Sequence, residues 1–128
     1  MRRFRWLIAL ALIAPAGVLL ANIAEPMWPV VGWDRVGPVL AEGCASCHDA
    51  ELALGGVDLS SYEAVLGGEN PPAVPYDMGS PLVRVLTEAP RSGMRGPDHT
   101  VLLSEGEKEL VFDWLRDGCY EVGWGDFD

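Results

Sequence analysis

The stretch Cys44-Ala45-Ser46-Cys47-His48 is a C-x-x-C-H motif, and the rest of the chain can be interpreted around it. Two thiols three positions apart can each form a thioether with one vinyl group of a haem, and the imidazole that follows can bind the iron. The motif therefore predicts one covalently attached haem c. Cys44 and Cys47 are its predicted attachment points, and His48 is the predicted proximal iron ligand.

Two other uses of these residues compete with this interpretation. A C-x-x-C pair can be a redox disulfide, but that use favours a βαβ pattern nearby and leaves His48 without a role. A tetrahedral zinc site could combine the two motif cysteines with His99 and Cys119. Against zinc, the second ligand pair lacks the usual paired spacing, and His48 again has no role. If the motif cysteines bind haem, Cys119 is either a free thiol or an intermolecular link.

The composition predicts one small acidic domain. The chain has 128 residues and a formal net charge of −10, and residues 25–128 hold all 19 acidic residues against six basic ones. Such a surface repels nucleic acid phosphates and anionic lipid, so nucleic acid is not an expected partner. It would suit redox partner proteins with basic docking faces, although an acidic surface that only confers solubility is equally consistent with the charge.

Residues 1–24 predict export from the cytoplasm. They begin with MRRFR and continue as an apolar run in which Asn22 is the one polar residue. The run is longer than an ordinary signal-peptide core and close to the length that spans a bilayer. We expect a single-pass anchor in a bacterial inner membrane with the domain in the periplasm, or a cleaved signal and a soluble periplasmic protein. Residues 25–33 read as a linker, in which Trp28 and Trp33 either anchor at the membrane surface or pack on the domain.

Apolar periodicity predicts an all-α domain. Its expected helices cover residues 34–48, 60–66, 81–88 and 104–117, and no convincing strand pattern appears. Asp34 is the predicted cap of the first helix. Ser60 with Glu63, and Ser104 with Glu107, have capping-box spacing.

Residues 89–103 contain helix breakers on both sides of Met94, so this methionine is expected on an extended loop that could cross a cofactor face. Met94 is the predicted distal iron ligand. Met78, His99 and an open iron site are the alternatives.

The order of these parts resembles the class I cytochrome c fold, and the amino-acid sequence of several stretches resembles planctomycete-type cytochrome c domains. The similar stretches are VLAEGCASCH (39–48), GGVDLSSY (55–62), SPLV (80–83), LSE (103–105) and WLRDG (114–118). The resemblance covers residues 34–118 and leaves 119–128 as an acidic C-terminal tail. It implies a small helical domain around one haem, with Met94 on the distal side. The family's methionine is commonly followed by Pro-Pro, whereas Arg95-Gly96-Pro97 follows here.

The function expected from these features is single-electron transfer by a tethered, non-enzymatic cytochrome. A fixed haem relay subunit in a larger respiratory or photosynthetic membrane complex is the second possibility. An enzyme or gas sensor with an open iron site is the third.

Overall fold

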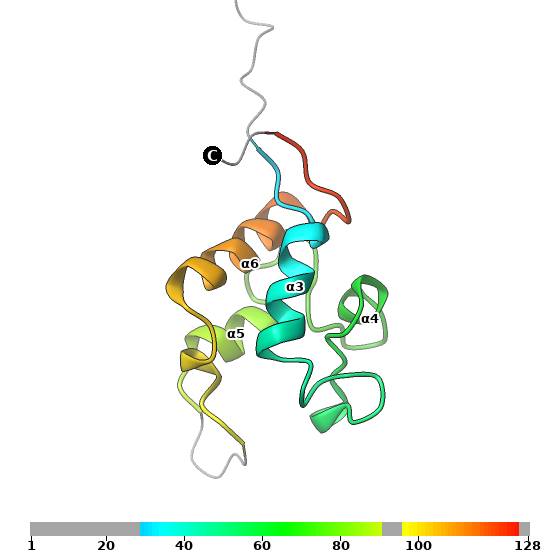
Figure 1. The fold of residues 1–128 in the computed structure, drawn as a ribbon, viewed down its shortest axis with the longest axis vertical. Coiled ribbons are helices and arrows are strands. Elements are labelled where there is room, and N and C mark those ends of the chain that lie inside the picture. The colour runs from blue at the N-terminus through cyan, green and yellow to red at the C-terminus, as the bar shows by residue number, and fades with distance from the viewer. Residues whose placement is uncertain (1–28, 91–95, 126–128) are drawn as a thin grey trace, which may run out of the picture.

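The computed structural model of the chain describes residues 29–90 and 96–125. In chain order its elements are α3 (Trp33–Gly43), the 3₁₀ turn η1 (Leu54–Gly56), α4 (Tyr62–Leu66), α5 (Pro81–Thr87), the 3₁₀ turn η2 (His99–Val101) and α6 (Glu105–Asp117) (Figure 1). The described part contains isolated β-bridges and no strand, which confirms the predicted helical class there. None of its helices is both long and apolar enough to cross a bilayer. Residues 1–24, for which an anchor or signal was predicted, lie outside the described ranges.

The core forms where α3 crosses α6 (Figure 1). Trp114 of α6 is fully buried, and its ring centre lies 5.6 Å from that of Trp33 at the start of α3. Val36 and Leu40, one turn apart on α3, are also fully buried. Trp33 therefore packs on the domain, as one of its two sequence interpretations proposed, while Trp28 lies outside the described residues.

Local sequence signals set both ends of α6. The Ser104 hydroxyl accepts from the Glu107 backbone N–H while the Glu107 carboxylate accepts from the Ser104 backbone, so the predicted capping box is confirmed. Gly118 follows the helix with a φ of 112°, a left-handed conformation that glycine adopts at little cost. Pro81 occupies the first turn of α5, where its missing N–H is no loss.

The α3 helix differs from its prediction at both ends. Gly32 is its N-cap, and the Asp34 carboxylate instead accepts from the Gly123 backbone N–H at 3.1 Å, so the prediction of Asp34 as cap was wrong. The Trp33 N–H donates to the carbonyl of Tyr120 at 2.9 Å, which satisfies an N-terminal donor from outside the helix. The helix ends at Gly43 rather than at His48, so the C-x-x-C-H motif lies in the turns that follow.

The cap of α4 is also shifted by one residue. The Ser61 hydroxyl accepts from the Ala64 N–H, and the predicted box of Ser60 with Glu63 does not form. Ser60 instead donates to the Asp58 carboxylate through its N–H and its hydroxyl, at 2.9 and 2.6 Å. That local turn competes with helix capping for the same serine.

The segment after α6 folds back on the segment before α3. Val30 and Trp124 exchange backbone hydrogen bonds of 2.7 and 3.0 Å, and the Trp114 indole donates to the Tyr120 carbonyl at 2.9 Å. Figure 1 shows these two chain ends side by side, at the opposite end of the molecule from η1 and η2. The approach needs glycine, since a Cβ on Gly123 would lie 2.4 Å from the Val30 carbonyl oxygen.

We expect Gly123→Ala to lower the free energy of unfolding by about 1–3 kcal/mol, because the added methyl forces the paired backbones apart. Chemical denaturation followed by circular dichroism measures the change. Gly106→Ala is the matched control, since a Cβ there meets no atom within 4 Å and lies in a helix. The control should gain about 0.5–1 kcal/mol. Equal effects of the two substitutions would contradict the close approach.

Candidate functional site

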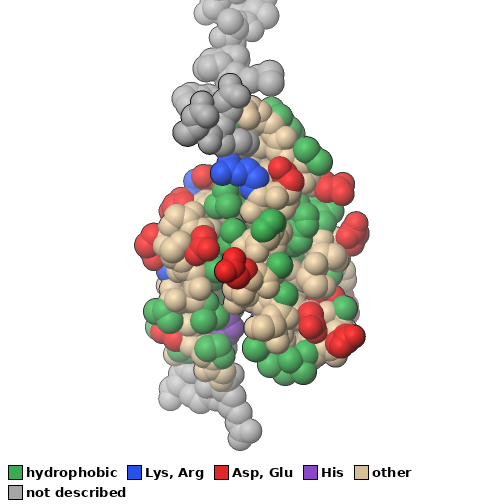
Figure 2. All heavy atoms as spheres, viewed as in Figure 1, with side chains coloured by type: hydrophobic (Ala, Val, Ile, Leu, Met, Phe, Trp, Pro, Cys, Tyr) green, Lys and Arg blue, Asp and Glu red, His purple; other side chains and the backbone are tan. Residues whose placement is uncertain are grey.

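A mainly apolar cavity of about 430 Å³ lies at the end of the molecule away from the paired chain ends. Its size falls within the roughly 300–1,000 Å³ typical of cofactor and ligand pockets. Figure 2 shows a hollow at this end, with a histidine side chain visible on its wall. The apolar side chains that line the cavity come from the loop after the motif, from α5 with the proline segment before it, and from η2: Leu54, Val57, Leu59, Pro72, Pro81, Leu82, Val85, Pro97 and Leu102.

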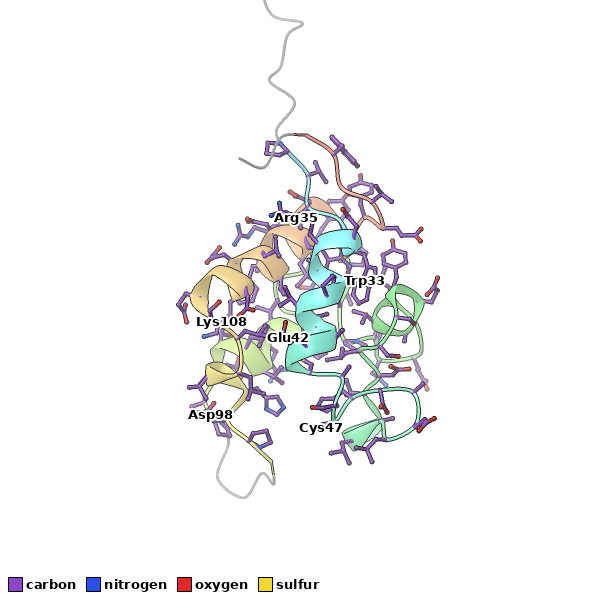
Figure 3. All side chains as sticks on the ribbon, viewed as in Figure 1. Trp33, Arg35, Glu42, Cys47, Asp98 and Lys108 are labelled. Carbon is purple, nitrogen blue, oxygen red and sulfur yellow. The ribbon has the colours of Figure 1, made fainter. Side chains whose placement is uncertain are left out.

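All three predicted haem-binding residues of the motif line this cavity. Cys44 caps the end of α3, and Cys47 and His48 follow in the next turn. Figure 3 places Cys47 at the cavity end of the molecule and Trp33 at the other end of α3. The structure therefore brings Cys44, Cys47 and His48 together on one apolar surface.

Backbone hydrogen bonds fix the motif against the loop that follows it. The His48 N–H donates to the Cys44 carbonyl at 3.1 Å, and the Leu59 N–H donates to the His48 carbonyl at 2.7 Å. The Leu54 N–H donates to the Cys47 carbonyl, also at 3.1 Å. Residues 47–59 thus form a closed loop, and its Leu54, Val57 and Leu59 line the same cavity as the motif.

The cavity is a low-dielectric environment. No aspartate, glutamate, lysine or arginine from the described residues lines it. Desolvation by burial raises the pKa of the Cys44 thiol, so that thiol stays protonated near neutral pH. His48 Nδ1 is buried and has no hydrogen-bond partner among the described residues, and an unpaired buried nitrogen of this kind needs an explanation.

These observations fit a haem. Paired thiols, an imidazole beside them and an uncharged apolar hollow are the groups that covalent haem attachment requires. They fit zinc less well, because no cluster of three or more His, Cys, Asp or Glu side chains suited to a metal ion occurs within the described ranges. Cys119, the fourth ligand of the zinc alternative, is buried near the end of α6 and does not line the cavity.

The candidates for the distal iron ligand differ in where the structure places them. Met94 lies outside the described residues and stays a prediction. Met78 is 37% exposed and does not line the cavity. His99 does line it, with its ring centre 6.1 Å from that of His48. In the sequence His99 is only an alternative to Met94, because no periodic signal places η2 against α5.

Comparison with known proteins gives a similarity of fold. No family model matches the sequence, and no curated protein matches it. A solved structure of hydrazine synthase from Kuenenia stuttgartiensis is similar, with a TM-score of 0.51 and 22% sequence identity. The match covers 76% of this chain and 17% of that chain, so the likeness concerns a limited part of a much longer protein. At this identity it supports the fold alone.

Cys119 differs from the motif cysteines in its surroundings. It is 1% exposed, and burial raises its pKa to about 12. The Tyr62 hydroxyl donates to its carbonyl at 2.8 Å, and its own N–H donates to the Trp114 carbonyl at 2.8 Å. This environment favours the interpretation of Cys119 as an unreactive buried thiol over its interpretation as half of an intermolecular disulfide.

We expect Cys119 to resist alkylation in the folded protein at pH 8 and to react on unfolding, with exposed Cys47 as the internal control before haem attachment. Mass spectrometry of timed samples measures both rates. Because the unfolded thiol ionises near its ordinary pKa of 9.0 and the folded one near 12, its contribution to stability is present below pH 9 and is lost between pH 9 and 12. Cys119→Ala should therefore make this alkaline loss of stability shallower. Alkylation of Cys119 as fast as Cys47 would contradict its burial.

Proposed function

We propose that this chain is a monohaem c-type cytochrome that transfers single electrons and is not itself an enzyme. The observation that carries the proposal is the convergence of Cys44, Cys47 and His48 on one apolar cavity of about 430 Å³. The helical fold, with the motif directly after its first described helix, supports a class I cytochrome c-like domain, and the stretches 39–48 and 114–118 resemble the planctomycete type. One haem c is the proposed cofactor.

Attachment needs reduced thiols, and the described cysteines are free. Each motif thiol would add across one vinyl group: the sulfur bonds to one vinyl carbon and the hydrogen goes to the other. The addition needs no oxidant and releases nothing. His48, held by backbone bonds on both of its sides, would bind the iron without rearranging the loop.

The protein's part in electron transfer is to hold one geometry and to keep water away. Bound haem would supply a one-electron iron couple. Leu59 and Leu82, at most 4% exposed, lie on the cavity wall and are anchored in the core. A rigid apolar wall lowers the reorganisation that accompanies a change of charge on the iron, because few solvent dipoles have to turn.

A fixed relay within a larger membrane complex is the second candidate. It is favoured by the similarity to hydrazine synthase, in which the matching fold covers only 17% of the chain. A domain of this fold thus occurs inside a larger enzyme. Co-elution with other subunits in detergent gel filtration would support a relay, whereas elution alone would support a free carrier.

We propose that the haem domain lies in the periplasm of a bacterium and is tethered to the inner membrane by residues 1–24. The three arginines before the apolar run would keep the N-terminus in the cytoplasm. A soluble periplasmic form released by signal cleavage is the alternative. The intact mass of protein extracted from membranes separates the two, since a tethered protein keeps residues 1–24.

We expect the protein produced with haem-attachment machinery to gain the mass of one haem and to keep its colour through acid–acetone extraction. Cys44→Ala and Cys47→Ala should each remove one thioether and lower the yield of coloured protein several-fold. Cys119→Ala is the control and should retain full attachment, because Cys119 does not line the cavity. Colourless wild-type protein that contains one zinc per chain would refute the proposal.

The proposed partners are redox proteins with basic docking faces. The part of the chain after residue 24 carries 19 acidic and six basic residues. Figure 2 shows acidic side chains distributed over the visible face, which is consistent with this charge. We expect the rate of electron exchange with a cationic redox reagent to fall several-fold as ionic strength rises from about 10 to 200 mM. An anionic reagent is the control and should react faster as salt rises. Stopped-flow absorbance measures both rates, and equal salt responses would contradict electrostatic steering.

A further inference from the structure

The two histidines of the chain face the same cavity from separate segments. Their ring centres are 6.1 Å apart with the ring planes inclined at 40°, and both rings line the cavity of about 430 Å³. His48 follows α3, whereas His99 begins η2, which packs against α5. The two side chains therefore approach one another only through the tertiary fold.

Each imidazole is carried by a separately fixed backbone. His48 is held by bonds to Cys44 and Leu59. His99 follows Asp98, whose carboxylate accepts from the Thr100 N–H and hydroxyl at 2.9 and 2.6 Å. Figure 3 places Asp98 and Cys47 at the same end of the molecule on different segments. The separation of the rings therefore depends on the packing of η2 against α5 and on the backbone hydrogen bonds that hold His48.

The separation suits two imidazoles on one metal ion. A metal–imidazole bond is about 2 Å long, and each ring centre lies about 1 Å beyond its nitrogen, so two ligands in line place their ring centres about 6 Å apart. Ordinary aromatic contacts also occur at about 4.5–7 Å, so the distance alone does not distinguish metal ligation from an aromatic contact.

The surroundings of the rings favour ligation over an ordinary contact. The space they line is a cavity and not a packed core. His48 Nδ1 is buried, and no residue in ranges 29–90 and 96–125 offers it a hydrogen bond. A buried imidazole nitrogen left unpaired costs about 1–3 kcal/mol, so hydrogen bonding does not explain why this ring lies at the cavity.

We propose that His99 is the second axial ligand of the iron, so that both faces are closed by imidazole. The inference rests on the proposed haem and adds its distal ligand. Closure of both faces suits electron transfer and leaves no position for oxygen or peroxide. Imidazole in place of a thioether also lowers the reduction potential, because methionine ligation raises it. Met94, the ligand predicted from the sequence, is the rival.

The test uses the full haem-loaded chain and compares His99→Gly with Met94→Leu. We expect the oxidised wild type to give the near-infrared magnetic circular dichroism of bis-imidazole haem, without a sulfur-to-iron charge-transfer band. His99→Gly should lose that signal and bind carbon monoxide when reduced, and added imidazole should restore the signal at one equivalent per haem. Met94→Leu should leave the spectrum unchanged.

A second variant keeps the test decisive if His99→Gly folds poorly. His99→Met should gain the sulfur-to-iron band and a higher reduction potential. A wild-type spectrum in both His99 variants, or loss of a sulfur-to-iron band in Met94→Leu, would overturn the assignment of His99 while leaving the haem in place. Absence of covalent haem from the wild type would instead refute the proposed function, and this inference with it.

Discussion

The packing of α3 against α6 around Trp114 is the contact on which the rest of the structure depends. Trp114 is fully buried, and its side chain meets Trp33 at one end of α3 while its indole donates to the Tyr120 carbonyl. Trp114 is the largest fully buried side chain among the described residues, and burial of so large an aromatic group contributes several kcal/mol. Because α3 is held along its length, its far end delivers the motif to the cavity in a fixed orientation.

The sequence predicted those elements whose signals are local. The capping box of Ser104 with Glu107, the terminal Gly118 and the start of α5 at Pro81 each depend on residues within one turn, and each is confirmed. The motif likewise identified Cys44, Cys47 and His48 without knowledge of the fold, and the structure places all three on one cavity. Their roles in binding haem stay predictions.

What the sequence missed depends on contacts between distant segments. The start of α3 is set by carbonyls of residues 120 and 121, so Asp34 was wrongly predicted as its cap. The helix was also predicted to continue through the motif, but Cys44 leaves helical geometry with a φ of −131°. The approach of His99 to His48 requires η2 to pack on α5, and no periodic pattern encodes that packing.

The pairing of Val30 with Trp124 gives the domain a mechanical asymmetry. A pull on the chain from its N-terminal side reaches the hydrogen bonds of that pair, at 2.7 and 3.0 Å, before it reaches α3. The backbone pairing of Val30 with Trp124 therefore bears such a force before the helical core does. Such a pull would load these two backbone hydrogen bonds first, and the cavity lies at the other end of the molecule.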